Sequence, residues 1–248
     1  MAWDARFFIA IFPDGQWCKV HAFSGGERAG LHCTSALEAL DGGPQHVAMI
    51  GRRDRVERRD DGASFEGSVV RATGVEASIE ARDRFFWCRV PRVLSYWSAT
   101  GRARVSIDGE TRDAFGVIEH AWGGETRVDV AALAPRRWQW DVLHLGDDRF
   151  FAGLALHGFG AHGAARLEAD RGISRVNRLR IETHEPGRSW RGVLVTRGGT
   201  LSYDARAATP VLPEVPDGGF LGFTWEGKLG GARVSGAGFS EFRARMSS

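Results

Sequence analysis

The chain has 248 residues, a length that suits one large all-β domain or two small ones and is ample for a buried core. Hydrophobic residues make up 43% and charged residues 26%, ordinary globular proportions that argue against disorder and against a membrane span. The net charge is +2 and acidic residues are interleaved with the arginines, so no nucleic-acid-binding face is predicted.

The first half of the chain is predicted to consist of short strands. Runs of four to eight residues rich in Val, Ile, Phe, Trp and Thr recur between Gly and Asp turn signals, without a sustained helical period. The predicted strands are 7–12, 16–22, 65–72, 75–81, 85–90 and 103–107. Asp108-Gly109 follows the last of these runs and is a strong hairpin signal.

Two segments of this half depart from the strand pattern. Residues 34–40 have the composition of one or two helical turns. The run 52–61 mixes arginines with acidic residues, which predicts a solvated loop or an edge strand, with a functional patch as the alternative.

The second half repeats the strand pattern. Its predicted strands are 138–145, 149–157, 164–168, 176–183, 189–197, 200–205 and 220–229. The proline-rich stretch 210–216 is predicted to be a stiff loop that crosses a sheet edge or covers an opening.

A short repeat relates the two halves. Gly116, Glu119 and His120 stand near the end of the first half in the order Gly-x-x-Glu-ring, and Gly238-Phe-Ser-Glu241-Phe242 has the same order near the end of the chain. Each half also opens with an aromatic-rich strand and a turn. These features predict a duplicated β unit with its join near residues 124–136, and domains at 1–127 and 128–248.

The segment 101–145 carries the most specific pattern. It contains Gly116-Val-Ile-Glu-His-Ala-Trp-Gly123 and then Trp138-Gln-Trp140. This pattern resembles the lipocalin-like, AttH-type superfamily of carotenoid 1,2-hydratases, tocopherol cyclases, survival-factor-like proteins and fungal Diels-Alderases, which carry G-x-x-[D/E]-[H/K]-x-W-G followed by W-x-W. Glu119 falls on the acid of that motif and His120 on the residue after it. Hydratases tend to have a histidine before the acid, where this chain has Ile118.

The resemblance implies an all-β fold of two consecutive lipocalin-like (calycin) antiparallel β-barrels or half-barrels. It also implies an apolar terpenoid, carotenoid or polyketide-like small molecule bound in or between them, and chemistry without a cofactor. A barrel of about eight strands encloses room for one small ligand, and nine tryptophans and 15 phenylalanines could line it.

Glu119 and His120 are the predicted catalytic residues. A carboxyl group in an apolar barrel has a raised pKa and can donate a proton near neutral pH, which would start a hydration, a cyclisation or an isomerisation. Neighbouring residues of a regular strand point to opposite faces, so both could reach one pocket only across a bulge. Glu119 is the one predicted to face the pocket.

Five further side chains are predicted to bind the substrate, because aromatic rings stabilise a nearby cation by ~0.5 to 2 kcal/mol. They are Trp97, Trp122, Trp138, Trp140 and His144. Each site residue also has a structural alternative, namely a carboxylate that braces two strands, a buried histidine, or tryptophans of the core. The corresponding alternative for the whole protein is a carrier or chaperone of an apolar molecule.

Other kinds of site are not expected. Cys18, Cys33 and Cys88 have no metal-ligand spacing and an odd number, which predicts free thiols in a reducing compartment, and the N-terminus lacks the pattern of a signal peptide. A cytoplasmic location follows as the default expectation. His144, His157 and His162 are the only conceivable metal cluster, and no metal is predicted.

Overall fold

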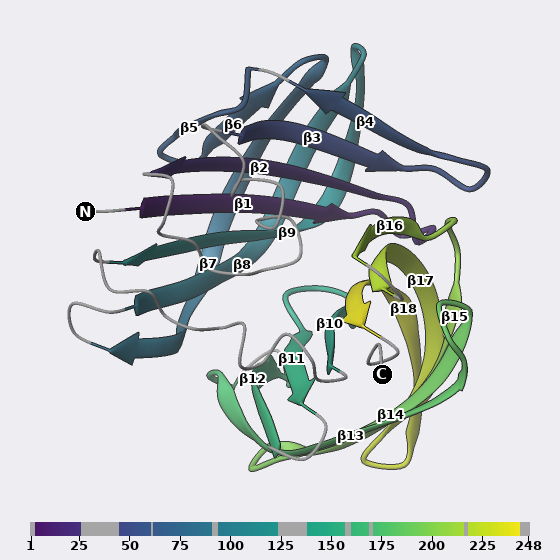
Figure 1. Cartoon of the computed structure of the whole chain (residues 1–248). Helices are drawn as coiled ribbons and strands as arrows, with labels where there is room; N and C mark the ends of the chain where they lie inside the picture. The colour runs from purple at the N-terminus through teal and green to yellow at the C-terminus, as the bar shows by residue number, and fades with distance from the viewer. Residues whose placement is uncertain are drawn as a thin grey trace. The chain divides into compact units, whose positions relative to one another are not determined.

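The computed structural model describes residues 3–25, 45–60, 62–90, 94–123, 138–156, 160–168, 171–215 and 218–243. None of these residues is helical and all regular elements among them are β-strands, which confirms the all-β prediction (Figure 1). Helices long and apolar enough for a membrane span are accordingly absent from the described ranges. The stretch 34–40, expected to be helical, lies outside them.

The chain divides into two compact units. Unit 1 comprises Met1–Ala10, Cys18–Ile50 and Glu57–Ala134, and unit 2 comprises Ile11–Trp17, Gly51–Val56 and Pro135–Ser248. The predicted join at 124–136, with the domain boundary after residue 127, lies outside the described residues.

Unit 1 is built on one nine-stranded antiparallel sheet with the strand order β4-β3-β2-β1-β9-β8-β7-β6-β5. The strands are β1 (Trp3–Ile11), β2 (Trp17–Gly25), β3 (Gln45–Gly51), β4 (Val56–Asp60), β5 (Ser64–Glu66), β6 (Val69–Ala72), β7 (Val75–Val90), β8 (Leu94–Ile107) and β9 (Glu110–Gly123). The charged run 52–61 is predicted to be a solvated loop or an edge strand. It contains β4, which lies at the edge of the sheet.

The hairpin of β8 and β9 turns at the Asp-Gly pair recognised in the sequence. Asp108 has φ 53° and Gly109 has φ 86°, the two positive values of a type I′ turn. From this turn the two strands pair without a shift of register as far as Leu94 and Gly123. The turn thereby fixes which residues of β8 lie opposite the Gly-x-x-Glu motif of β9.

Two predicted strand boundaries in unit 1 are wrong. The run 65–72 is a tight hairpin rather than one strand, because Gly67 adopts φ 62° and reverses the chain between β5 and β6. The runs 75–81 and 85–90 form a single strand, β7, which stays paired with β8 through two register shifts. In both places a local backbone irregularity, which the hydrophobic pattern does not reveal, decides the boundary.

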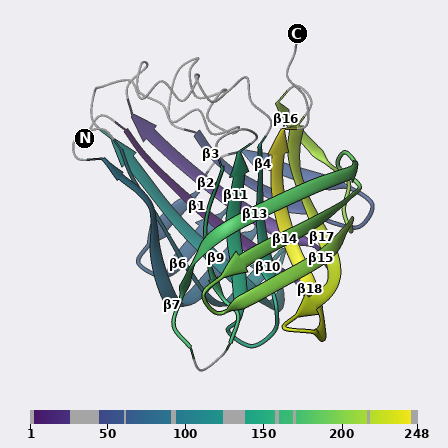
Figure 2. The same ribbon diagram turned by 90° about the horizontal axis from the view of Figure 1, so that it is seen from below.

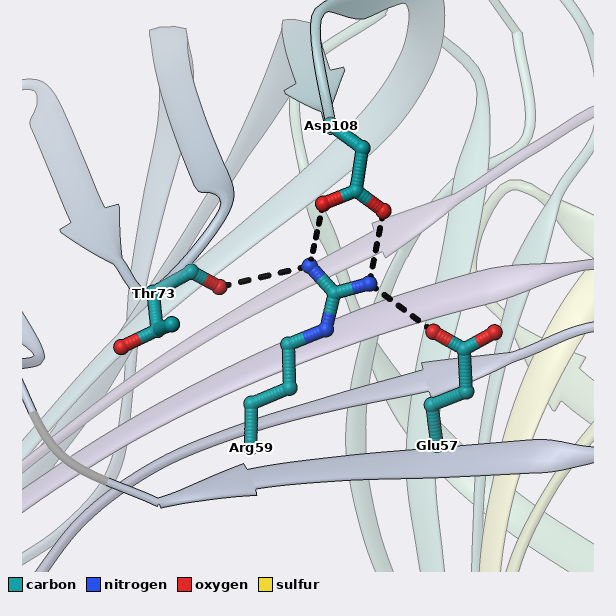
Figure 3. A network of polar contacts seen from close by, with 4 residues as sticks. All are labelled: Glu57, Arg59, Thr73 and Asp108. Carbon is teal, nitrogen blue, oxygen red and sulfur yellow. Dashed lines mark hydrogen bonds and ion pairs between the residues drawn. The ribbon is translucent and has the colours of Figure 1, made fainter.

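Arg59 links the edge strand β4 to the other half of the sheet (Figure 3). Its guanidinium donates to both carboxylate oxygens of Asp108 at 2.8 and 2.7 Å, to Glu57 at 2.9 Å and to the carbonyl oxygen of Thr73 at 3.4 Å. Asp108 lies in the β8–β9 turn and Thr73 in the β6–β7 turn. Contacts between segments so far apart in the strand order mean that the sheet curls into a half-barrel.

Arg59→Lys is expected to lower the free energy of unfolding by about 1 kcal/mol, because an ammonium cannot form the two parallel bonds to one carboxylate. The comparison is urea unfolding of this variant beside Arg71→Lys, whose guanidinium pairs with Glu66 and Glu76 on the exposed surface. The control should unfold like the wild type. Equal behaviour of the two variants would contradict the clamp assigned to Arg59.

Unit 2 is a closed barrel. Its strand order is β15-β14-β13-β12-β11-β10-β18-β17-β16, and pairing of β15 with β17 closes eight strands into a ring with β16 at the side (Figure 2). The strands are β10 (Trp138–His144), β11 (Phe150–Leu156), β12 (Gly160–Arg166), β13 (Ser174–Glu185), β14 (Ser189–Thr196), β15 (Gly199–Ala207), β16 (Leu212–Val215), β17 (Gly218–Leu229) and β18 (Ala232–Arg243). The predicted proline loop 210–216 thus contains a short strand that pairs with β17.

The two units share a connection pattern. In each, the last strand lies between the first strand and the one before the last, as β1-β9-β8 in unit 1 and β10-β18-β17 in unit 2. Glu119 on β9 and Glu241 on β18 therefore occupy corresponding strands. A duplicated β unit predicts this correspondence, and the fold of one barrel and one half-barrel confirms the predicted architecture.

Candidate functional site

Strand β9 separates the two predicted catalytic residues. Its buried positions alternate through Phe115, Val117, Glu119 and Ala121, whereas His120 and its neighbours on the other face are half-buried. No bulge interrupts the pairing of β8 with β9 here. The expectation that Glu119 and His120 point to opposite faces is confirmed, and the two side chains do not converge on one pocket within this strand.

Glu119 is held by two hydroxyl groups of β8. Glu119 is buried, with 4% of its surface exposed. Ser98 lies directly opposite and donates from Oγ to Oε1 at 2.6 Å, and Tyr96 donates from Oη to Oε2 at 2.9 Å. Because a hydroxyl can both donate and accept, these partners can bond the carboxylate and the carboxylic acid alike. The arrangement allows the group to gain and lose a proton without losing these two partners.

His120 belongs to an aromatic group on the opposite face. Its Nε2 lies 2.6 Å from Asp4 Oδ2, and its ring centroid is 4.5 Å from that of Trp122 and 6.0 Å from that of Trp97. The guanidinium of Arg84 lies 3.8 Å from the centre of the Trp97 ring. Three predicted site residues are therefore brought together, but across the sheet from Glu119.

The strand alternation identifies what shares a face with Glu119. Asp4 and His120 are in contact, so they lie on one face of the neighbouring strands β1 and β9. Phe7, three residues after Asp4, and Glu119 must then lie on the other face. We call the residues of this second face the Glu119 face: Phe7, Lys19, His21, Tyr96, Ser98 and Glu119.

Lys19 and His21 enter this face from β2. The His21 ring stacks on Phe7 with centroids 4.7 Å apart and planes inclined by 18°, and the Lys19 ammonium lies 5.5 Å from the same ring centre. Lys19 is 2% exposed and His21 is 1% exposed. Nε2 of His21 has no hydrogen-bond partner among the described residues. Burial, and then the nearby charge of Lys19, lowers the pKa of His21 from 6.5 to about 3.

The depressed pKa of His21 makes stability depend on pH. A histidine that stays neutral in the folded state contributes stability above its unfolded pKa, and this contribution is lost as the pH falls toward the folded value. With pKa values of 6.5 and about 3, the free energy of unfolding should fall by about 2 kcal/mol between pH 7.5 and pH 5 on account of His21. Urea unfolding of wild type and His21→Phe at both pH values measures this share, and an identical pH dependence of the two proteins would refute it.

The remaining predicted residues belong to unit 2. Trp138 and Trp140 share a face of β10 as predicted, and Trp140 packs on Phe239 with ring centroids 6.1 Å apart. Leu143, on the other face of β10, belongs to the barrel core, so the two indoles point away from the barrel interior. His144 Nε2 lies 3.0 Å from the carbonyl oxygen of Asp147, and burial lowers the pKa of His144.

Inside the barrel, Asp141 is fully buried with four donors. Oδ1 accepts from Ser240 at 2.7 Å and from Gln139 at 2.9 Å, and Oδ2 accepts from Tyr203 at 2.7 Å and from Trp190 at 2.9 Å. Burial raises the pKa of Asp141, against the opposing effect of these hydrogen bonds. The indole of Trp190 can only donate. This network suits an acceptor that ties the barrel together rather than a group that exchanges protons.

Sequence reasoning missed several of these residues. The chain has two tyrosines beside 15 phenylalanines, and each tyrosine hydroxyl donates to a buried acid, Tyr96 to Glu119 and Tyr203 to Asp141. Such scarcity is a usable signal, because a hydroxyl kept in an aromatic-rich chain usually has a partner when buried. A second usable signal is the aspartate inside the apolar run 138–145, which is Asp141.

The cysteines and the conceivable histidine cluster lie partly outside the described residues. Within these residues no group of three His, Cys, Asp or Glu side chains could hold a metal ion, and His157 of that cluster lies outside them. Cys18 is free and buried, and burial raises the pKa of its thiol to about 12. Cys33 and the side chain of Cys88 are not among the described groups, so for them the free thiol stays a prediction.

Comparison with known proteins identifies the fold. No protein-family model matches the sequence, and no curated protein matches it either. Among solved structures, kievitone hydratase from Nectria haematococca aligns with a TM-score of 0.56 at 12% identity, over 97% of this chain and 88% of that one. CghA aligns with a TM-score of 0.58 at 13% identity, over 99% of this chain and 89% of that one.

An AttH-like protein from Nitrosomonas europaea aligns with a TM-score of 0.52 at 12% identity, over 97% of this chain and 92% of that one. At these identities the similarity establishes a shared fold over nearly the whole chain. The fold implied by the resemblance to AttH-type proteins is thereby confirmed.

Proposed function

We propose that the protein is a cofactor-independent enzyme in which Glu119 gives a proton to an apolar substrate and so starts a hydration, a cyclisation or a double-bond isomerisation. The single observation that carries this proposal is the pair of hydroxyl bonds to the buried Glu119 carboxyl group. Both partners can stay bonded to the carboxyl group in either protonation state, which suits a group that cycles between the two states.

The route by which the proton returns is provided by Tyr96. Tyr96 is only partly buried, and its hydroxyl group donates to Oε2 of Glu119. A phenol in this position can accept a proton from water and pass one to the carboxylate. Ser98 is fully buried and holds the other carboxylate oxygen in place. Tyr96 is thus the relay and Ser98 the positioning residue.

Asp141 shows why burial of an acid is not sufficient for this role. Two of its four partners donate through nitrogen, and the Trp190 indole can never accept. Protonation of Asp141 would require the hydroxyl of Ser240 or Tyr203 to turn from donor to acceptor, while the two nitrogen donors favour the carboxylate. Of the two buried acids that bond to a tyrosine, Asp141 is the one with two nitrogen donors, which favour the carboxylate over the acid.

The proposed substrate is terpenoid, carotenoid or polyketide-like. The face around Glu119 on β9 carries Phe115, Val117 and Ala121, all buried and apolar. A solved structure with the same fold is a kievitone hydratase by name, which supports addition of water as one of the three reactions. The catalytic role predicted for His120 stays a prediction, and its position implies that it would act apart from Glu119.

The test is incubation in deuterated water with a panel of polyenes and prenylated phenols, followed by mass spectrometry. Wild type should add deuterium or one water to a member of the panel, and Glu119→Gln should not. Glu241→Gln is the matched control, because it neutralises the corresponding acid of unit 2, and it should behave like wild type. Labelling that survives unchanged in Glu119→Gln would overturn the proposal.

A carrier of apolar molecules is the alternative, favoured by the place of Glu119 and Glu241 on corresponding strands, which suits a pair of bracing carboxylates. Loss of a bracing carboxylate should lower the free energy of unfolding by about 1 to 3 kcal/mol. Replacement of a catalytic acid by glutamine should change the free energy of unfolding only a little. Urea unfolding of Glu119→Gln separates the two functions, with tight retention of one unchanged compound as the further mark of a carrier.

A further inference from the structure

We propose that Lys19 and His21 form a subsite that binds an oxygen atom of the substrate, so that the substrate is an oxygenated apolar molecule rather than a hydrocarbon. The inference rests on the proposed function, because it places a polar group of the substrate on the face that holds Glu119. It assigns a role to the buried imidazole nitrogen of His21, which proton donation by Glu119 leaves unexplained.

The first support is the unpartnered imidazole nitrogen. Within the described residues, Nε2 of His21 makes no hydrogen bond although the side chain is buried. Buried polar atoms nearly always have a partner, and an exception calls for a water or a ligand that is not present. A neutral imidazole nitrogen can donate to a carbonyl or accept from a hydroxyl group according to its tautomer.

The second support is the charge beside it. The chain uses arginine almost everywhere and has only two lysines, yet one of them, Lys19, is 2% exposed. Lysine is rarely buried. Its ammonium places a positive charge near the Phe7 ring on which His21 stacks. A position of this kind suits stabilisation of a partial negative charge on oxygen.

The third support is the platform that fixes both groups. The imidazole of His21 stacks on the ring of Phe7, and the Lys19 ammonium lies near the same ring. The two polar ends are held on one rigid strand pair and are two residues apart on β2. Groups locked by packing on strands provide the pre-organised geometry that an oxygen-binding site requires.

The sheet also sets the size of the substrate. Strand β1 lies between β2 and β9, so His21 and Glu119 are two strand spacings apart on one face. Measured across the strands, this separation is on the order of 10 Å, and apolar Phe7 lies in the interval. The substrate class that fits has a ketone or hydroxyl at one end, an apolar body, and the reacting double bond roughly 10 Å away.

The experiment measures binding by calorimetry with three prenyl ketones of increasing length: methylheptenone, geranylacetone and farnesylacetone. Each is paired with the hydrocarbon in which a methylene replaces the carbonyl. Wild type should bind geranylacetone about tenfold more tightly than its hydrocarbon, because the subsite forms a hydrogen bond with the carbonyl. Geranylacetone is also the ketone of the three whose terminal double bond lies roughly 10 Å from the carbonyl, which matches the strand spacing. His21→Phe and Lys19→Met should bring this ratio close to one, whereas exposed His184→Phe should preserve it.

Two results would overturn the subsite. One is a ratio near one in wild type, and the other is a ratio that persists in both variants, which would mean that Nε2 meets a buried water only. His21→Phe keeps the stacking on Phe7, so its binding ratio tests the subsite even if Lys19→Met fails to fold. Glu119→Gln keeps the binding ratio if the subsite exists, so a failure of the catalytic proposal is seen separately in the deuterium experiment.

Discussion

Asp141→Ala should lower the free energy of unfolding by roughly 3 to 5 kcal/mol, because it removes the acceptor that four donors share inside a barrel. Trp190 comes from β14, Tyr203 from β15 and Ser240 from β18, so the carboxylate joins distant parts of the ring. Loss of these bonds loosens the closure itself. Equilibrium unfolding in urea, followed by tryptophan fluorescence, measures the change.

Two variants make that experiment specific. Asp141→Asn keeps one acceptor oxygen and should lie between wild type and Asp141→Ala. Asp204→Ala removes an exposed carboxylate that pairs with Arg191 on the same barrel, and should change little. An Asp141→Ala protein as stable as Asp204→Ala would show that the four bonds contribute nothing net.

Glu119→Gln should reduce kcat by about 10² to 10⁴ once a substrate is known, because glutamine keeps the shape of the carboxyl group but cannot supply the proton. KM should change much less, since the apolar contacts of the face remain. Tyr96→Phe should slow turnover less severely, because Ser98 still holds the acid and only the relay is lost. Steady-state kinetics of these variants and of Glu241→Gln gives all the comparisons.

A different pattern would assign the acid elsewhere. If Glu119→Gln raised KM and left kcat unchanged, Glu119 would serve binding alone. If Tyr96→Phe were as slow as Glu119→Gln, the phenol rather than the carboxyl group would be the proton donor.

Local patterns in the sequence were sufficient for much of the fold. Strand alternation in β9 correctly separated Glu119 from His120, and the Asp108-Gly109 pair correctly marked the β8–β9 turn. Each of these depends on neighbouring residues only. The hairpin at Gly67 was missed, because Phe65 to Ala72 has the composition of one continuous strand and a single positive φ divides it.

The Glu119 face could not be predicted from local patterns. Along β2, Cys18 and Val20 alternate with Lys19 and His21, a pattern that predicts one buried and one solvated face. Both faces are buried in the fold. The barrel network has the same character, since Tyr203 reaches Asp141 over 62 residues and only after the ring closes. Tertiary packing decides such positions.

The most direct test of proton donation by Glu119 is the stereochemistry of deuterium incorporation. Product formed by wild type in deuterated water is examined by deuterium NMR. A carboxylic acid fixed in the fold predicts label on one face of one carbon, with no such label from Glu119→Gln. Label distributed equally over both faces, or the same single-face label from Glu119→Gln, would contradict the assignment of Glu119 as the acid.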